Sequence, residues 1–495
     1  MWPTSDQVLA KFWQSGLWDP LLGALGLLNR VLPLERPRRP LPAPEKPGLL
    51  PRPAGREKVL VAGAAVEDIT PPRLEGVYLA GFAADRKALG VRDPISARAL
   101  YLHDGETPLL LICLDLIGLS RARVERIRAR ITDTHRENVI VHCTHNHQGP
   151  DTLGLWGKSL FGFLPIRSGL DDAYLDLLEQ RIARAVARAV ETAVPARLLF
   201  AQAEFDRGGR WVRNEHGASQ DRTARFLQAR AADGAVIATL VQHACHPETL
   251  WREGRVISAD FCGVCCRAIE QELGGVALYA NGALGAMVTT ALDRRESESE
   301  RERFLDGLGE ALADLAKERL SRARPAARPR IRIACKKIYF PARENRLFVM
   351  LHRLGIVEAR DIGDSVESEA ALVRIGPASI LSLPGEPEPE AAQALLAGVL
   401  GRPRFLLGLA NDELGYLMPP QKFSDPAYAY ECAMSPGPSA LSVLQNCVRE
   451  LEDGLKPAGF RPARAASTIG RARGKIRARR APDANRDPPI QGGNE

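Results

Sequence analysis

The chain has 495 residues, enough for one large domain or two smaller ones. Hydrophobic residues make up 45% and charged residues 26%, a balance that excludes a mainly disordered, collagen-like or multi-span membrane protein. Only 6% of the residues are aromatic, which argues against a surface that stacks nucleic-acid bases. The net charge of +7 comes from residues 461–480, whose eight Arg or Lys leave the rest of the chain at −1. We therefore expect no nucleic-acid partner.

Both ends of the chain differ in composition from its middle. Residues 1–32 are apolar and predict an amphipathic segment that docks on the protein or lies on a membrane surface. Residues 33–57 are rich in proline and predict an extended linker. Residues 461–495 predict a basic, disordered tail, for which contact with anionic lipid is one reading and simple solubility another. A folded domain is predicted over residues 58–460.

Nine cysteines occur without regular spacing. Disulfide frameworks are typical of small secreted domains, so we expect free thiols and a cytoplasmic location, with peripheral membrane contact as the alternative. Cys262, Cys265 and Cys266 form the one cluster. Their i, i+3, i+4 spacing predicts a buried helix face rather than a zinc or redox site.

Strand and helix patterns alternate through the predicted domain without a short repeat. Strands are predicted at residues 59–70, 97–103, 108–115, 234–243, 329–340, 371–375, 378–383 and 404–410. Two more are predicted at the start of ENVIVHCTHNH (residues 137–147), before a polar loop, and at the start of GGVALYANGALG (residues 274–285), before a glycine loop. Helices are predicted at residues 119–134, 171–193, 300–322, 386–399 and 436–454, and in ISADFCGVCCRAIEQEL (residues 257–273) after a Ser/Asp cap. This alternation predicts a layered α/β fold, with a mixed α+β fold as the alternative.

The segment HCTHNHQGPDT carries the first candidate site. His145 and His147 follow a predicted strand, and side chains at i and i+2 of an extended chain point to the same side. Imidazole is a good zinc ligand, so the pair is a candidate start of a metal site. His142 faces the other way and is predicted to be structural.

Three later segments add candidate ligands. His246, in QHACHPETL, also follows a buried strand, and two histidine motifs at strand ends favour one shared metal site. Glu386 follows Pro384-Gly385 and is predicted at the turn into a helix, where an acid is also favourable without any metal. The segments NDELGY and AYAYEC contribute Tyr416 and Tyr430.

The order of these motifs resembles the neutral/alkaline non-lysosomal ceramidase family. The resemblance runs from about residue 59 to residue 435 through AGAAVEDITPP, GVYLAGFAADR, ARAL, LDLIGL, THNHQGPDT, CHPETL, PGE and NDELGY. Members of this family are zinc amidases that cleave the N-acyl bond of ceramide, a sphingolipid. The resemblance implies that His145, His246, Glu386 and Tyr416 hold zinc and that His147 lies beside the bound water. It also implies that Arg213 and Tyr430 contact the substrate.

The sequence departs from the family pattern in two places. The family carries a serine, assigned a catalytic role, in a G-D-x-S-P loop, whereas the matching stretch here is LGAMVTT with Val288 at the serine position. Thr289 is one position away. The family also has a C-terminal immunoglobulin-like domain, and the roughly forty residues after the last predicted helix here are too few for one.

We therefore expect a zinc-dependent hydrolase that cleaves an amide bond, perhaps in an N-acyl lipid, with a metal-activated water. Zinc lowers the pKa of its water toward about 7, His147 can accept the proton, and backbone amides near Gly282 and Gly285 are predicted to stabilise the oxyanion. The alternative is a non-catalytic ceramidase-like protein that binds a partner or a membrane surface. The missing serine favours this alternative, and the retention of all four ligand candidates disfavours it.

Overall fold

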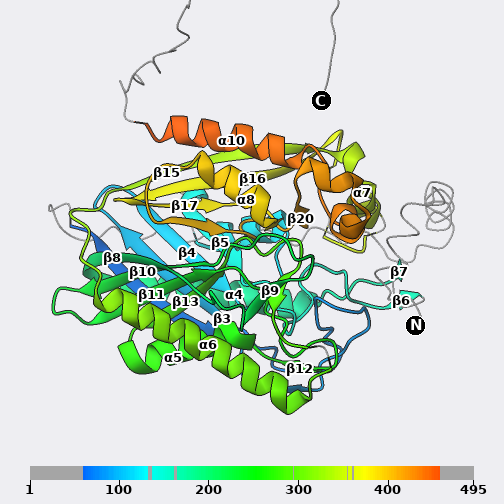
Figure 1. Cartoon of the computed structure of the whole chain (residues 1–495), viewed down its shortest axis with the longest axis horizontal. Coiled ribbons are helices and arrows are strands. Elements are labelled where there is room, and N and C mark those ends of the chain that lie inside the picture. The colour runs from blue at the N-terminus through cyan, green and yellow to red at the C-terminus, as the bar shows by residue number, and fades with distance from the viewer. Residues whose placement is uncertain are drawn as a thin grey trace, which may run out of the picture. The chain divides into compact units, whose positions relative to one another are not determined.

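The computed structural model describes residues 59–131, 136–160, 164–293, 295–353, 355–358, 360 and 362–456 (Figure 1). The predicted N-terminal segment, proline-rich linker and basic tail lie outside these residues. No helix in the described ranges is long and apolar enough to cross a bilayer.

Two mixed sheets form the centre of the molecule. The larger has eight strands in the spatial order β13 (Val276–Asn281), β11 (Val236–His243), β10 (Thr223–Ala231), β8 (Val194–Glu204), β1 (Val61–Asp68), β3 (Ser96–His103), β4 (Pro108–Leu114) and β5 (Val139–Cys143). The smaller has the order β15 (Ile331–Pro341), β16 (Ser365–Ile375), β17 (Ala378–Ser382) and β19 (Arg404–Leu407). Most neighbours are antiparallel, but β5, β13 and β19 pair in parallel with β4, β11 and β17.

Short two-stranded pairings tie loops together at the edges of these sheets. They are β2 (Gly90–Val91) with β12 (Val256–Ile257), β9 (Val212–Asn214) with β14 (Val288–Thr290), β18 (Glu386–Pro387) with β20 (Tyr416–Leu417), and β6 (Ser159–Leu160) with β7 (Leu164–Pro165).

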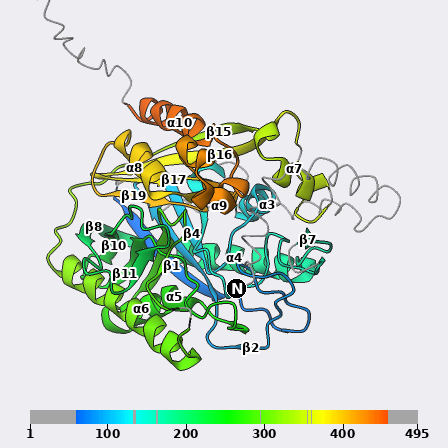
Figure 2. The same ribbon diagram turned by 45° about the vertical axis from the view of Figure 1, so that its right-hand side comes forward.

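Helices cover the outer faces of both sheets (Figures 1 and 2). On the larger sheet they are α3 (Arg121–Ile131), α4 (Asp172–Glu191), α5 (Asp260–Leu273) and α6 (Glu298–Ser321). On the smaller sheet they are α8 (Pro389–Ala397) and α10 (Ala440–Gly454). The shorter α7 (Arg346–Arg353) and α9 (Ala429–Ala433) lie in the connecting segments. A hydrophobic core that includes Leu100, Leu240, Val373 and Phe405 fills the space between the sheets. The order helix, sheet, sheet, helix confirms the predicted α/β class.

The formation of α4 follows from its sequence. Asp171 caps the helix by accepting hydrogen bonds from the backbone of Ala173 and Tyr174. Leu175, Leu178, Ile182, Val186 and Ala189 recur at helical spacing and are buried against β1 and β3. Most of the other predicted elements appear within a few residues of their expected bounds. Two long strands, β8 and β10, were not predicted.

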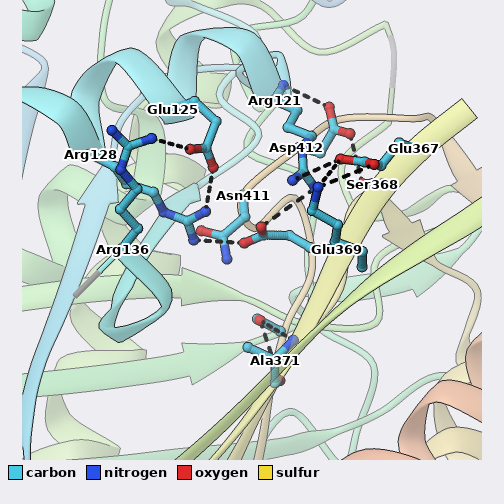
Figure 3. A network of polar contacts seen from close by, with 12 residues as sticks. Arg121, Glu125, Arg128, Arg136, Glu367, Ser368, Glu369, Ala371, Asn411 and Asp412 are labelled. Carbon is cyan, nitrogen blue, oxygen red and sulfur yellow. Dashed lines mark hydrogen bonds and ion pairs between the residues drawn. The ribbon is translucent and has the colours of Figure 1, made fainter. Parts of the chain in front are cut away.

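A network of ion pairs joins α3 to β16 and to the loop after β19 (Figure 3). Arg128 is buried and contacts Glu369 at 2.7 Å and Glu125 at 2.9 Å. The Asp412 carboxylate accepts hydrogen bonds from the Arg121 backbone (2.9 Å) and the Ser368 hydroxyl (2.7 Å). We call this set, with Arg136 and Glu367, the arginine network. It fixes the start of the loop that continues to Tyr416.

Candidate metal centre

His145 lies in the loop directly after β5. Its backbone has φ of +67°, a conformation that is uncommon outside glycine and that concentrates at functional sites. The Nδ1 atom lies 2.9 Å from the carbonyl oxygen of Ile117. A carbonyl can only accept, so this contact assigns the ring proton to Nδ1 and leaves the Nε2 lone pair free.

His246 follows β11 and is held in the same manner. The Val288 carbonyl accepts hydrogen bonds from both His246 Nδ1, at 2.8 Å, and the His246 backbone N–H, at 2.9 Å. The Nε2 lone pair of His246 is therefore also free. Val288 thus supports His246 through its backbone.

Asn281 holds the two histidine loops together. Its buried side chain accepts from the Cys245 N–H at 3.0 Å and donates to the carbonyls of Thr144, at 2.6 Å, and Cys245, at 2.9 Å. Asn281 ends β13, and β13 also contacts β4 and β5 across the curled sheet. Residues that stand far apart in strand order thus meet at one point.

Glu386 completes a convergent set. One carboxylate oxygen, Oε2, lies 3.4 Å from His145 Nε2 and 3.2 Å from His246 Nε2. Ligands bound tetrahedrally at about 2.1 Å from zinc lie about 3.4 Å from one another. The two separations from Glu386 Oε2 are therefore close to the edge length of a zinc tetrahedron.

The position of Glu386 differs from the predicted helix start. Glu386 begins the short strand β18, which pairs in parallel with β20 so that Glu386 lies opposite Tyr416. The α8 helix begins later, with Glu388 as its cap, accepting from the backbone of Glu390 and Ala391. The prediction was wrong because the pairing partner of Glu386 comes from a distant segment.

His147 lies beside this set. One ring nitrogen from each of His145, His147 and His246 lies within 4.8 Å of the others. The Nδ1 atom of His147 is 3.4 Å from Glu248 Oε2. Gly81 packs flat against the His147 ring, since a Cβ atom at Gly81 would come within 2.3 Å of it. The Arg86 guanidinium donates to the His147 carbonyl.

Burial dominates the electrostatics of these groups. It holds the pKa of His145 and of His147 well below the usual range, with neighbouring histidines adding to the effect. Burial also lowers the pKa of His246 and raises the pKa of Glu386 well above its usual range, with Glu431 adding to the latter shift. The imidazoles are therefore neutral, with lone pairs available to a metal.

A mainly apolar cavity of about 120 Å³ adjoins the convergent atoms. Its lining includes His145, His147, Glu386, Tyr416, Tyr430, Ile117, Leu153, Trp156, Phe348 and Met434. The rings of Tyr416 and Tyr430 lie 6.1 Å apart at an angle of 65°, and the Tyr416 hydroxyl lies 3.6 Å from the Met287 sulfur. Tyr416 and Tyr430 thus face the space beside the convergent set.

Two predicted groups lie elsewhere. Arg213 belongs to β9, pairs with Glu215 at 2.8 Å and lines a separate small cleft with Glu248 and Thr289. The predicted oxyanion amides are wrong. The Gly282 N–H donates to the His243 carbonyl at 3.3 Å and the Gly285 N–H to the Pro387 carbonyl at 3.0 Å, so neither faces a substrate.

The donor set fits a metal ion. His145 and His246 each donate from Nδ1 to a backbone carbonyl, as metal-bound histidines commonly do. Their Nε2 atoms both face the same oxygen of Glu386. In the described part of the chain, the Glu386 carboxylate contacts histidines and forms no ion pair with Arg or Lys. A buried carboxylate with neutral neighbours is a favourable place for a divalent cation.

Comparison with known proteins gives the family. Residues 60–291 match the family described as neutral/alkaline non-lysosomal ceramidase, N-terminal. These residues are thus identified as the N-terminal domain of this ceramidase family. The matched range contains His145, His147 and His246, whereas Glu386 and Tyr416 come after it.

Two solved ceramidase structures have the same fold. One is the crystal structure of the neutral ceramidase from Pseudomonas aeruginosa, with 17% identity over 80% of this chain and 74% of that chain, at a TM-score of 0.65. The other is a ceramidase complexed with C2, with 16% identity over 83% of this chain and 78% of that chain, at a TM-score of 0.66. The likeness thus extends the shared fold well beyond the matched family range.

The sequence analysis missed three groups around the centre. Glu248 contacts His147, Asn281 joins the histidine loops, and Gly81 lacks the Cβ atom that would clash with the His147 ring. Glu248 had a usable signal, because an acid two residues after a candidate ligand is close to the site wherever that ligand binds. Asn281 and Gly81 carried no such signal, since their roles depend on contacts with distant segments.

Proposed function

We propose that this ceramidase-family protein is a zinc-dependent hydrolase that cleaves the amide bond of an N-acyl lipid, a sphingolipid being the expected class. The observation that carries the proposal is the convergence of His145 Nε2 and His246 Nε2 on one oxygen of Glu386 at the wall of an apolar cavity. A cavity of this kind suits an acyl chain.

In this proposal His145, His246 and Glu386 would hold the zinc ion, and the Tyr416 hydroxyl oxygen would be the fourth ligand. Bound zinc polarises the scissile carbonyl and lowers the pKa of a water molecule. The neutral Nε2 of His147 accepts the proton of the attacking water and returns it to the nitrogen of the departing amine. Tyr430, on the cavity wall, contacts the substrate.

A protein nucleophile is not needed for this chemistry. Val288 carries no hydroxyl, and the Thr289 hydroxyl donates to Glu248. The water molecule is therefore the attacking group in the proposal. The lack of a hydroxyl at Val288 also favours the rival function. In that function the ceramidase-like protein binds a partner or a membrane without catalysis.

The first experiment measures the metal content of the purified full chain. We expect about one zinc per chain, lost in His145→Ala and in His246→Ala and retained in the control His103→Ala, whose histidine lies at the end of β3 by the turn to β4. The same four proteins are then tested for hydrolysis of N-acyl lipid amides. Bound zinc without hydrolysis supports the rival function, a binding protein without catalysis. Absence of zinc from the supplemented wild-type chain overturns both the zinc site and zinc-dependent hydrolysis.

A further inference from the structure

Glu248 is a buried acid next to the candidate centre that the proposed function leaves without a role. Its side chain is 2% exposed, and its backbone N–H donates to the His246 carbonyl at 3.0 Å. The short loop after β11 therefore sets the position of both His246 and Glu248. Burying a carboxylate is costly unless it has specific partners.

The two oxygens of Glu248 have different partners. Oε2 lies 3.4 Å from His147 Nδ1, and Oε1 accepts a hydrogen bond from the Thr289 hydroxyl. Thr289 is fixed in turn by β14, where it lies opposite Arg213 of β9. The carboxylate is thus oriented by one neighbour so that its second oxygen faces the imidazole.

His147 has few other polar restraints on its ring. Neither ring nitrogen has a hydrogen-bond partner within the described ranges. Phe82 meets the ring edge-on at 4.9 Å and Gly81 lies against it, so the ring is held by shape. At 3.4 Å the contact with Glu248 is a few tenths of an ångström longer than an N–H···O hydrogen bond, and such contacts tighten when a site is loaded.

We propose that Glu248 is a positioning residue that accepts the Nδ1 proton of His147 and so presents the Nε2 lone pair to the centre formed by His145, His246 and Glu386. This inference rests on the proposed function, in which His147 Nε2 accepts a proton. An acceptor fixed at one imidazole nitrogen selects the tautomer with the lone pair on the other. The Glu248 carboxylate also stabilises the imidazolium that forms when Nε2 takes up a proton.

The pairing also gives Thr289 a defined task. Its hydroxyl donates to Glu248 and not to His147, so it sets the acid rather than attacking the substrate. Val288, at the family's serine position, offers its carbonyl to His246. In this chain, the segment after Met287 thus supports both histidine loops.

Glu248→Gln provides the test, because Thr289 determines how the new amide group is oriented. The Thr289 hydroxyl favours the amide oxygen of the new side chain, which turns the amide NH₂ toward His147 Nδ1. His147 Nδ1 must then accept a hydrogen bond, and the ring proton moves to Nε2.

Two further variants accompany this test. Thr289→Val keeps the shape of the threonine but removes its hydroxyl. Glu253→Gln removes a charge five residues away, where the side chain is 59% exposed.

The tautomer of His147 is read by ¹⁵N NMR of histidine-labelled, zinc-supplemented full-length protein, with the signal assigned by its loss in His147→Gln. We expect Nδ1–H in the wild-type chain and in Glu253→Gln, Nε2–H in Glu248→Gln, and a mixture in Thr289→Val. The same tautomer in the wild type and in Glu248→Gln overturns the proposal.

Kinetics provide a second readout that a purely structural role would not give. With an N-acyl amide substrate, Glu248→Gln should lower kcat by about 10- to 100-fold and leave KM within about twofold. An unchanged kcat also overturns the positioning role. If the wild-type chain hydrolyses no N-acyl amide, the proposed function fails, whereas the NMR result still decides whether Glu248 sets the tautomer of His147.

Discussion

Two clusters of buried polar side chains lie at opposite ends of the loop that runs from Asp412 to Tyr416. At the Asp412 end, the arginine network faces each buried guanidinium with carboxylates, as Arg128 faces Glu369 and Glu125. At the Tyr416 end, one Glu386 oxygen faces the lone-pair nitrogens of His145 and His246. The network is balanced by the chain's own charges, whereas no Arg or Lys among the described residues forms an ion pair with Glu386. Burial alone therefore does not distinguish a structural from a functional cluster, but charge balance does.

The largest effect should come from breaking the balance of the arginine network. Arg128→Met leaves the buried Glu369 with one remaining ion pair among the described residues, a longer contact to Arg121 at 3.5 Å. We expect the free energy of unfolding to fall by about 3 to 5 kcal/mol, measured by denaturant titration. The double variant Arg128→Met/Glu369→Leu should recover most of the loss.

Arg136 provides the matched control for that experiment. Its side chain is 46% exposed and contacts Glu125 at 3.3 Å. Arg136→Met should cost less than about 1 kcal/mol, since exposed ion pairs contribute little. Equal losses at Arg128 and Arg136 would contradict the expected difference between a buried and an exposed ion pair.

The pH dependence tests the histidine that borders the centre. His142 donates from Nδ1 to the Gly408 carbonyl at 2.7 Å and accepts at Nε2 from the Asn281 N–H at 3.0 Å. Burial lowers its pKa from 6.5 to about 4. The unfolded chain therefore binds this proton first, so stability is full above pH 6.5 and falls as the pH drops toward 4.

The contribution of His142 to that loss should be on the order of 3 kcal/mol. It is measured as the difference between the wild-type chain and His142→Gln in unfolding free energy at pH 7 and at pH 4. We expect the variant to lose less stability over this interval. Parallel curves for the two proteins would show that His142 does not titrate in this way.

Zinc should stabilise the centre and leave the network unchanged. At a free zinc concentration about 100 times Kd, binding to the folded chain adds about 2.7 kcal/mol to the free energy of unfolding. Denaturant titrations with and without zinc should show this gain in the wild type and in Arg136→Met. Its persistence in His246→Ala would place the metal elsewhere.

The smallest effect is expected at Arg213. This side chain is 37% exposed and pairs with Glu215 outside the cavity. Arg213→Gln should change the unfolding free energy by less than about 1 kcal/mol and kcat/KM by less than about twofold. A tenfold loss of kcat/KM would support the substrate contact that the family resemblance implies for Arg213.

The histidines of the centre could be located from sequence because local pattern determines where they lie. A buried apolar strand followed by a polar loop places His145 and His246 at strand ends, and the same reasoning assigned His142 to the opposite side. The partners of these residues could not be inferred in this way. Nothing near His246 indicates that its Nδ1 donates to the carbonyl of Val288, 42 residues later.

The remaining errors have the same origin. Glu386 follows Pro-Gly and precedes a helical pattern, so local signals favour a helix start. Its pairing with Tyr416 instead makes it part of a strand. The strands β8 and β10 carry Arg, Gln and Ala among their apolar residues, which weakens their alternation, and they are stabilised by pairing with each other over nine register positions. The arginine network likewise joins residues as far as 291 positions apart, as at Arg121 and Asp412.

The separation of the candidate ligands along the chain has a consequence for biosynthesis. His246 and Glu386 are 140 residues apart. A ribosome adding 5–20 residues per second needs roughly 7 to 28 s to pass from one to the other. Throughout that interval the nascent chain holds both histidine loops but lacks the acid that completes their geometry. Acquisition of an ion would thus be a late event in translation, and the availability of zinc at that moment would decide whether the newly made chain closes around it.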